Sequence, residues 1–171
     1  YIGRLECINS VANWMWPSID ETDGAELRDA VNQLCKLSHS LSFSINGGKD
    51  SLSMKVKNDK EEVKAPSTLT LSGYATINDH FSIITPNLKT LDSKIILIRL
   101  DKFRGGMLGS AYGRFYPTSK KSIEWLEIEK FPTIWKVIQD LINTRFIVSG
   151  HDISDGGLIT TLTEMAISSY F

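Results

Sequence analysis

Five consecutive residues have side chains and backbone suited to binding phosphate, namely Gly47, Gly48, Lys49, Asp50 and Ser51. The glycines let the backbone approach an anion closely, so that a run of N–H groups can surround it. Lys49 offers a positive charge to a phosphate oxygen, and Asp50 offers a carboxylate to a metal ion or to the lysine. The segment follows an asparagine, and Asn-Gly is also a common hairpin signal, so a plain β-turn is the alternative interpretation.

A second candidate site lies at residues 151–157, His-Asp-Ile-Ser-Asp-Gly-Gly, between a predicted strand and a predicted helix. Ser154 or Asp155 can serve as the helix N-cap, and the N–H groups of the first turn favour an anion in front of it. Asp152 precedes the cap and can hold a hard cation such as Mg²⁺ between protein and phosphate. The alternative is a structural helix cap beside a hydrogen-bonded histidine, although two carboxylates and two glycines exceed what a cap needs.

The elements that must position the first segment follow from the spacing of the apolar residues. Apolar side chains at helical spacing predict an amphipathic helix over residues 24–41. Alternating apolar residues then predict a strand that enters a turn at residues 46–48, and the alternation resumes after the turn. A polar hairpin loop at residues 58–64 and a second long strand at residues 69–77 complete this half.

The second half begins after a turn-rich stretch without periodicity, residues 86–93, which predicts a linker. It is expected to contain an aliphatic strand buried on both faces at residues 94–100, a short glycine-spaced helix within residues 105–116, and a helix from Pro132 to Ile142. A short strand at residues 146–149 and a final helix at residues 158–166 follow. The pattern predicts a protein of mixed helices and strands, α/β in the broad sense that includes α+β, in two parts with a boundary near residue 92.

The first segment is similar to the phosphate loop of ATP pyrophosphatases that adenylate their substrates, which reads Ser-Gly-Gly-x-Asp-Ser. The chain departs from that pattern only at Asn46. In those enzymes the loop follows a buried strand and leads into an apolar helix. Here the residues on both sides alternate, which predicts β-turn-β and argues against this family.

Composition excludes several kinds of partner. The 171 residues are 42% hydrophobic and 23% charged, as in an ordinary globular protein, and the net charge of −1 provides no basic field for a nucleic acid. The longest aliphatic run, residues 95–98, is far too short to span a membrane. Cys7 and Cys35 cannot form a disulfide framework and lack zinc-site spacing, which fits a reducing compartment. Neither a nucleic-acid partner nor a membrane is expected.

Several motifs, in order and across nearly the whole chain, resemble the second half of the phosphoribosylformylglycinamidine synthase family. Each motif alone is weak, but the ordered set is specific. Three departures concern substrate contacts: Asn46-Gly47 replaces Pro-Val, Arg28 replaces tyrosine, and residues 20–24 lack the usual His-x-Gly-Glu. The matching motifs are Asn13-Trp14-Met15, Leu27-Arg28-Asp29-Ala30-Val31, Gly48-Lys49-Asp50-Ser51-Leu52-Ser53-Met54, Ala65-Pro66-Ser67-Thr68-Leu69, Met107-Leu108-Gly109-Ser110-Ala111, the nine residues 150–158, and Glu164-Met165-Ala166.

The resemblance implies a fold and a larger polypeptide. Residues 1–92 would be the C-terminal part of an aminoimidazole-ribonucleotide-synthetase-like (AIR-synthetase-like) N-terminal domain, which is rich in β-structure. Residues 93–171 would be the N-terminal part of the companion α/β domain. The chain begins at Tyr1 in what resembles mid-domain sequence, so an interior fragment is expected. It is expected to be inactive alone, because further metal ligands of the family would lie upstream.

The resemblance also implies a reaction. The family converts formylglycinamide ribonucleotide, glutamine and ATP to formylglycinamidine ribonucleotide, glutamate, ADP and phosphate in purine biosynthesis. By this resemblance Mg²⁺ and ATP or ADP are the cofactors, and the location is the cytoplasm. The expected partners are small-molecule substrates and the remaining domains of the same polypeptide, including a glutaminase domain. A noncatalytic nucleotide site is the alternative, because the family's two halves are pseudo-symmetric.

The resemblance places a Mg²⁺ ligand at Asp152 and a nucleotide contact at Ser154. Both fall in the segment that the residue types single out independently. The expected nucleotide- and phosphate-binding residues are Gly47, Gly48, Lys49, Asp50, Ser51, Ser154, Gly156 and Gly157, and the expected metal ligand is Asp152.

Overall fold

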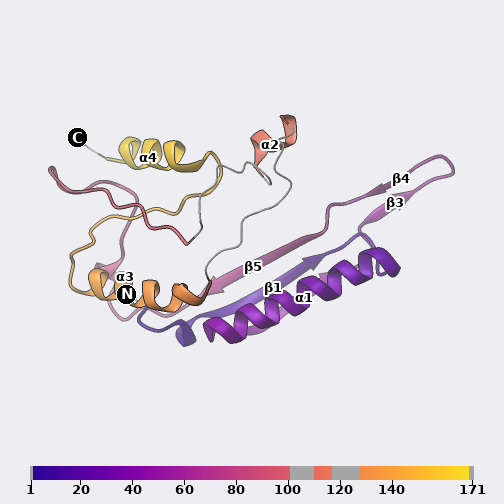
Figure 1. Ribbon diagram of the computed structural model, residues 1–171, viewed down its shortest axis with the longest axis horizontal. Helices are drawn as coiled ribbons and strands as arrows, with labels where there is room; N and C mark the ends of the chain where they lie inside the picture. Colours follow the sequence, from indigo (N-terminus) through magenta and orange to yellow (C-terminus); the bar gives the residue numbers. More distant parts are fainter. Residues whose placement is uncertain (1, 101–109, 117–127, 170–171) are drawn as a thin grey trace. The chain divides into compact units, whose positions relative to one another are not determined.

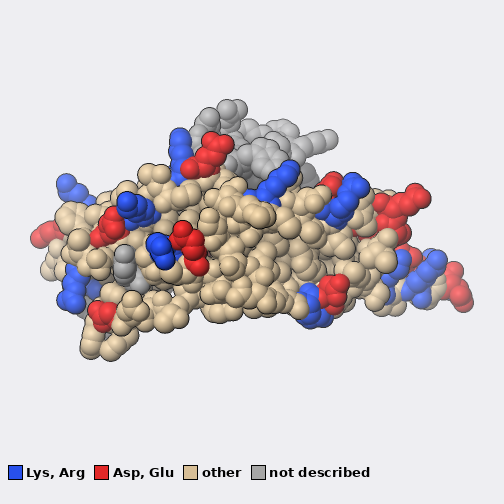
Figure 2. Space-filling model, turned by 90° about the horizontal axis from the view of Figure 1, so that it is seen from below, with Lys and Arg blue, Asp and Glu red and all other residues tan. Residues whose placement is uncertain are grey.

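The computed structural model describes residues 2–100, 110–116 and 128–169 (Figure 1). The chain divides into two compact units, Ile2–Asn78 and Asp79–Phe171. Helices and strands are mixed, as expected for the α/β class. Every helix in the described part of the chain is too short or too polar to span a bilayer. Acidic and basic residues are interspersed on the face drawn in Figure 2, which agrees with the small net charge.

The first unit is built on a three-stranded sheet with the strand order β2-β1-β5. The central strand β1 (Asn9–Met15) runs parallel to β2 (Ser44–Ser51) and antiparallel to β5 (Thr68–Tyr74). A parallel pair needs a crossover connection, and α1 (Glu21–Leu41) provides it, running beside the strands (Figure 1). This β-α-β unit places residues 47–51 on an edge strand of the sheet.

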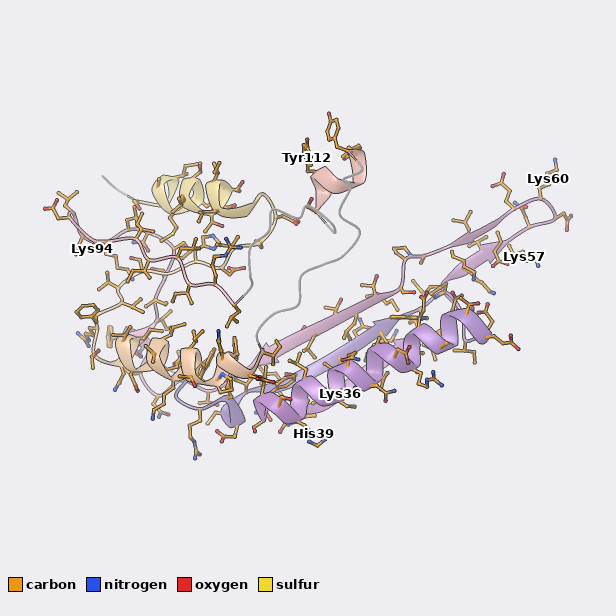
Figure 3. All side chains as sticks on the ribbon, in the orientation of Figure 1. Lys36, His39, Lys57, Lys60, Lys94 and Tyr112 are labelled. Carbon is orange, nitrogen blue, oxygen red and sulfur yellow. The ribbon has the colours of Figure 1, made fainter. Side chains whose placement is uncertain are left out.

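The helix α1 confirms the element predicted over residues 24–41 and begins slightly earlier. Its start is capped by the side chain of Asp20, and its end lies at Ser42, which adopts the left-handed conformation with φ 57°. Leu34 is buried on the apolar stripe, whereas His39 is exposed on the polar side (Figure 3). Helical periodicity was therefore sufficient to predict this element.

The strand β1 buries one of its two faces. Ser10 and Ala12 of β1 are only 2% and 5% exposed, and Trp16, directly after the strand, is 6% exposed, whereas Val11, on the opposite face, is 40% exposed. The indole Nε1 of Trp16 donates a hydrogen bond of 2.8 Å to the backbone oxygen of Asp23 in α1. The buried face of β1 is thereby joined to the helix.

The turn predicted at residues 46–48 is wrong, because β2 continues through this stretch. Parallel pairing with β1 supplies the backbone partners, and a register shift between Ser10 and Val11 leaves Asn46 as an extra residue in β2. The side chain of Asn46 donates to Asn9 Oδ1 at 2.7 Å. The Asn-Gly sequence therefore forms a β-bulge and not a turn, because pairing with β1 outweighs the local turn preference.

A small hairpin follows the edge strand. It consists of β3 (Lys55–Lys57) and β4 (Glu62–Lys64), so the polar loop predicted over residues 58–64 is in part a strand. The next strand, β5, confirms the prediction at residues 69–77 but ends at Tyr74. Since the first element after β2 is a strand and not a helix, the β-loop-α arrangement of the ATP pyrophosphatases is absent from this described region.

The second unit is mainly helical in its described part. The helix α3 confirms the one predicted from Pro132, and α4 confirms the one predicted over residues 158–166. The short helix expected within residues 105–116 is present only as α2, and residues 105–109 lie outside the described residues. The elements are η2 (His80–Ser82), α2 (Ala111–Phe115), η3 (Ile128–Lys130), α3 (Phe131–Asn143) and α4 (Gly157–Ile167).

The two strands predicted in this unit do not form in the described residues. Residues 94–100 have no regular structure, and Ile95 and Ile96 are 62% and 69% exposed. Residues 146–149 take part only in an isolated parallel bridge between Ser149 and Thr85. A strand buried on both faces requires neighbouring strands, and none of the strand pairings among the described residues involves this stretch.

The stretch predicted as a linker is anchored within the second unit. Gly150 donates its backbone N–H to Thr85 O at 3.2 Å, and Lys89 Nζ donates to Val148 O at 2.7 Å. The hydroxyl of Ser149 donates to Asn87 O at 2.7 Å. Residues 85–89 therefore pack against residues 148–150, which lead directly into the second candidate site.

Candidate functional site

The first candidate segment is part of β2, so its side chains divide between the two faces of the sheet. Asp50 is opposite Trp14 of β1, whereas Lys49 is opposite Asn13. Lys49 and Ser51 share one face, and the Lys49 ammonium donates to Ser51 Oγ at 2.5 Å. The structure therefore brings Lys49 and Ser51 together, and it turns Asp50 away from the lysine that it was expected to orient.

A shallow, open pocket lies against the middle of β2. A methyl group at Gly47 would meet no atom within 4 Å, so the backbone is accessible there. On β1, next to Lys49, the side-chain oxygen of Asn13 is buried and accepts no hydrogen bond from a described residue. The segment therefore provides an open surface and not an enclosing phosphate loop. The pocket is lined by Ala12, Trp14, Ile45, Gly47, Gly48, Lys49 and Asp50.

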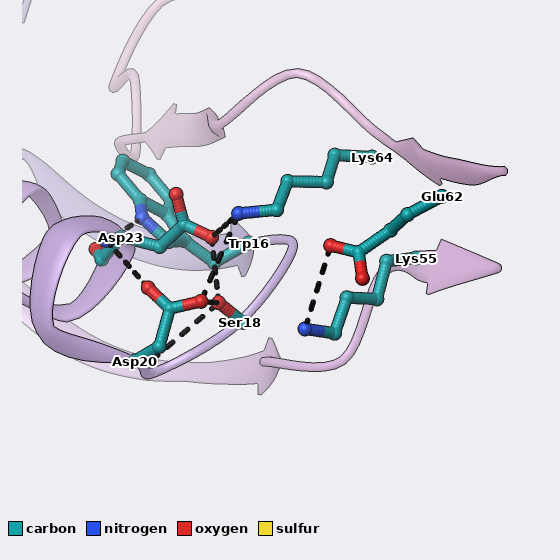
Figure 4. A network of polar contacts seen from close by, with 7 residues as sticks. All are labelled: Trp16, Ser18, Asp20, Asp23, Lys55, Glu62 and Lys64. Carbon is teal, nitrogen blue, oxygen red and sulfur yellow. Dashed lines mark hydrogen bonds and ion pairs between the residues drawn. The ribbon is translucent and has the colours of Figure 1, made fainter. Parts of the chain in front are cut away.

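A network of polar side chains joins the start of α1 to the β3–β4 hairpin (Figure 4). The Ser18 hydroxyl lies 2.6 Å from Asp20 Oδ2 and 2.5 Å from Asp23 Oδ2. The Lys64 ammonium lies 2.7 Å from Asp23 Oδ2 and 3.7 Å from Asp20 Oδ2. Sequence reasoning missed this network, although two acidic residues three positions apart at a helix start are a capping signal.

The contacts in this network favour the charged forms. The hydrogen bond from Ser18 and the backbone N–H of Asp23 lower the pKa of Asp20 to about 2. The hydrogen bond from Lys64, followed by that from Ser18, lowers the pKa of Asp23. The Asp23 carboxylate in turn raises the pKa of Lys64. The three groups therefore remain ionised at neutral pH, as an ion-pair network that supports structure requires.

The second candidate segment presents one exposed carboxylate beside a half-buried histidine. The Asp152 side chain is 83% exposed and that of His151 is 18% exposed. The His151 ring places Nδ1 3.2 Å from Asp152 Oδ1 and Nε2 3.2 Å from Glu164 Oε2. The hydroxyl of Thr161 donates to the backbone oxygen of Asp152 at 3.3 Å. The helix α4 therefore contacts Asp152 at both its side chain, through His151, and its backbone.

The prediction that Ser154 or Asp155 caps α4 is wrong. The N-cap residue is Gly156, which has no side chain with which to cap the helix. Gly156 and Gly157 have φ angles of 85° and 70°, in the region that favours glycine, so the chain turns into the helix through its backbone. The Gly157 N–H donates to Ser154 O at 3.1 Å and closes this turn. The two glycines are thus structurally required, whatever they bind.

The residues present fit a single carboxylate ligand of Mg²⁺. This ion prefers oxygen ligands, keeps several waters, and is commonly held by one or two carboxylates together with substrate phosphates. Asp152 supplies one such carboxylate, which is open to solvent. Within the described residues, no group of three or more His, Cys, Asp or Glu side chains is arranged to hold a metal ion. Further ligands would have to come from phosphate, water or other residues.

Two family descriptions match the chain in succession. "FGAR-AT PurM_N-like domain" matches residues 1–76, and "AIR synthase related protein, C-terminal domain" matches residues 92–171. The first range covers the sheet, α1 and the hairpin, and the second covers α2, α3 and α4. The two ranges together leave only residues 77–91 unmatched.

Curated relatives match over nearly the whole chain. The probable phosphoribosylformylglycinamidine synthase of Caenorhabditis elegans is 39% identical over 98% of this chain. The phosphoribosylformylglycinamidine synthases of Drosophila melanogaster and Homo sapiens are 36% and 32% identical, over 97% and 96% of it. The chain spans 12–14% of the length of these three relatives.

Proposed function

Since the chain belongs to the phosphoribosylformylglycinamidine synthase family, we propose that it supplies part of the nucleotide and Mg²⁺ site of this ATP-dependent ligase. The observation that carries the proposal is the exposed Asp152 carboxylate in front of the first turn of α4. A carboxylate at this place can bind a cation while the N–H groups of the helix start face an anion. A nucleotide with its bound Mg²⁺ combines both charges.

The proposed reaction is the conversion of formylglycinamide ribonucleotide to formylglycinamidine ribonucleotide in purine biosynthesis. The substrate's amide oxygen takes the γ-phosphoryl group of ATP, and ADP leaves. Ammonia from glutamine then attacks the activated carbon, and phosphate leaves with the former amide oxygen. Positioning and charge stabilisation dominate such phosphoryl transfers, so the protein needs cation and phosphate contacts more than an acid-base pair. When bound, Mg²⁺ would neutralise charge on the phosphate oxygens.

Each residue of the second segment has a proposed role. Asp152 would be one Mg²⁺ ligand, and Ser154 would contact the nucleotide. Gly156 and Gly157 would present the backbone at the start of α4 to phosphate, since neither has a side chain in the way. The closed turn between Ser154 and Gly157 supports this assignment, because it holds the segment in one conformation.

The first segment has a narrower proposed role. Lys49 and Ser51 lie on the same face of β2 and are in contact, so together they would bind a phosphate or carboxylate group of a substrate. Gly47 lies on this face with open space around it and would let that group approach, and Gly48 would let β2 lie close to β1 behind it. Asp50 lies on the opposite face, next to Trp14, and would contribute to the pocket there.

The larger assembly follows from the same membership. We propose that residues 1–92 end an AIR-synthetase-like N-terminal domain and that residues 93–171 begin its companion. The partners would be the remaining domains of one polypeptide, including a glutaminase domain, together with the small-molecule substrates. The proposed compartment is the cytoplasm, although one relative, from Arabidopsis thaliana, is named as chloroplastic/mitochondrial.

Replacing Asp152 in the complete enzyme tests the proposal. Asp152→Asn keeps the shape of the side chain but removes the charge, and we expect Mg²⁺-dependent nucleotide binding and kcat/KM to fall by at least about 100-fold. Asp155→Asn is the matched control, since it removes a charge from the same loop and should change both quantities far less. Unchanged binding and turnover in Asp152→Asn would contradict the proposal.

A structural nucleotide site is the second candidate. A single exposed carboxylate, with no group of three or more metal-binding side chains among the described residues, fits a structural site as well as a catalytic one. The same variant separates the two. If Asp152→Asn loses bound nucleotide and thermal stability while turnover of the remaining folded enzyme is unchanged, the site is structural.

A further inference from the structure

We propose that His151, Glu164 and Thr161 are positioning residues that hold Asp152 in the orientation in which it binds a divalent cation. The inference rests on the proposed function, since it assumes that Asp152 is a Mg²⁺ ligand. It goes further by assigning a task to three residues that neither the motifs nor the composition singled out for this role. Two of them, Thr161 and Glu164, belong to α4, so the helix itself would position the ligand.

The side-chain part of this arrangement is a bridge through an imidazole ring. The His151 side chain is only 18% exposed, and its two nitrogens each lie 3.2 Å from a carboxylate oxygen. One carboxylate belongs to Asp152 and the other to Glu164. The ring lies between the two carboxylates and donates an N–H to a carboxylate oxygen, so it cannot rotate without losing a contact. Glu164 and Asp152 therefore hold the ring between them, and the ring restricts the positions open to the Asp152 side chain.

The backbone part of the arrangement depends on Thr161. This residue is 5% exposed, and its hydroxyl lies 3.3 Å from the backbone oxygen of Asp152 and 3.2 Å from that of Gly157. A hydroxyl has one proton, which these two acceptors share. The loop and the first turn of α4 are thus joined at a buried point, whereas Thr163, two residues on, donates only to Ile159 within the helix.

The arrangement leaves half of the Asp152 carboxylate for a ligand. Oδ1 contacts His151, and Oδ2 accepts no hydrogen bond from a described residue. A carboxylate on a solvent-exposed loop would otherwise move among several rotamers and lose their entropy on binding the cation. Fixing the backbone and one oxygen removes much of that loss before the ion arrives. Hydrogen-bond partners of metal ligands commonly act in this way.

The test measures Mg²⁺ affinity in the complete enzyme by calorimetric titration in the presence of ADP. We expect Glu164→Gln, His151→Gln and Thr161→Val each to weaken Mg²⁺ binding by about 10- to 100-fold. ADP binding without Mg²⁺ should change little, because none of the three residues is expected to touch the nucleotide. Thr161→Ser restores the hydroxyl and should restore most of the affinity. Thr163→Ala is the matched control on the same helix and should leave it unchanged.

Thermal unfolding without Mg²⁺ distinguishes positioning from simple support of the fold. If Glu164→Gln and His151→Gln lower the melting temperature but leave Mg²⁺ affinity unchanged, the positioning role is overturned. Asp152→Asn serves as the reference for the proposed function. If it also leaves Mg²⁺ affinity unchanged, the metal assignment itself fails. If it weakens binding while the other three variants do not, only the positioning inference fails.

Discussion

Lys64 Nζ lies 2.7 Å from Asp23 Oδ2, although the two residues are 41 positions apart in the sequence. The pair joins β4 of the hairpin to the first turn of α1 (Figure 4). In the sequence, α1 precedes β2 and β4 follows it, so the pair links the elements on either side of residues 47–51. The Asp23 side chain is 12% exposed, which makes the lysine its main compensation for lost water.

Removing the ammonium group should therefore destabilise the first unit. Lys64→Met keeps most of the side-chain volume and leaves the Asp23 carboxylate with the Ser18 hydroxyl as its remaining side-chain partner. We expect the melting temperature to fall by several degrees. Lys57→Met is the control, since Lys57 is an exposed lysine on the same hairpin (Figure 3), and it should have little effect. Equal melting temperatures for the two variants would contradict a structural role for the pair.

Stability should also fall in acid. A carboxylate whose pKa is lowered on folding contributes stability above its ordinary pKa, and that contribution is lost as the pH falls through the folded value. For Asp20 the two values are 3.8 and about 2, and Asp23 shifts in the same direction. Melting temperatures measured between pH 7 and pH 2 should therefore drop mainly below about pH 4.

The variant Asp20→Asn provides the comparison for this pH dependence. It is expected to be less stable at neutral pH, because an amide cannot reproduce the charge-assisted hydrogen bond from Ser18 or the attraction to the Lys64 ammonium 3.7 Å away. Its melting temperature should then change less between pH 4 and pH 2 than that of the parent. Parallel curves for the two proteins would show that Asp20 does not cause the acid sensitivity.

Sequence patterns predicted elements whose signal is local and uninterrupted. The helix α1 has a continuous apolar stripe, and α3 and α4 have helical periodicity, so all three were predicted, although the cap of α4 was not. The segment at residues 46–48 was mistaken for a turn, because its Asn-Gly signal is local whereas its pairing with β1 is not. Residues 94–100 have the composition of a buried strand but no regular secondary structure.

The candidate sites show the same division. Sequence alone singled out residues 151–157 and showed that their loop precedes a helix. It could not show that Glu164 and Thr161 reach back to this loop, since those contacts depend on how α4 is oriented. Nor could it show that Lys49 and Asp50 point to opposite faces, because a loop was expected where there is a strand.

Two adjacent glycines in β2 should respond very differently to substitution. A methyl group at Gly48 would lie 2.1 Å from the carbonyl oxygen of Ala12 in the paired strand, whereas one at Gly47 would meet nothing within 4 Å. Gly48→Ala must separate β1 from β2 and should cost about 1–3 kcal/mol of unfolding free energy. Gly47→Ala should change it by no more than about 0.5 kcal/mol.

Urea denaturation of both variants measures this difference. The comparison is closely matched, because both substitutions add one methyl group to the same strand and carry the same propensity cost. If the two variants have the same midpoint, the close approach of β2 to β1 at Gly48 is not present in solution. Binding of a phosphate or carboxylate group at Lys49 should also weaken in Gly48→Ala but not in Gly47→Ala, since only the former would shift the strand that carries the lysine.

The two glycines at the start of α4 permit a similar comparison with a different cause. Both have positive φ, so Gly156→Ala and Gly157→Ala should each cost about 1–2 kcal/mol in backbone strain. A methyl group at Gly156 would in addition lie 2.2 Å from Thr160 Oγ1, whereas one at Gly157 would meet nothing within 4 Å. Gly156→Ala should therefore be the more destabilising substitution in urea denaturation.

The variant Thr160→Ala separates the steric cost at Gly156 from the backbone strain. Combined with Gly156→Ala it removes the clashing hydroxyl, so the double variant should recover part of the lost stability, while Gly157→Ala with Thr160→Ala should recover none. Recovery is incomplete because the Thr160 Cβ would still lie 2.7 Å from the new methyl group. Equal effects of Thr160→Ala on both glycine variants would mean that the start of α4 is not held by Gly156 in this conformation, and the proposed phosphate contact there would lose its structural basis.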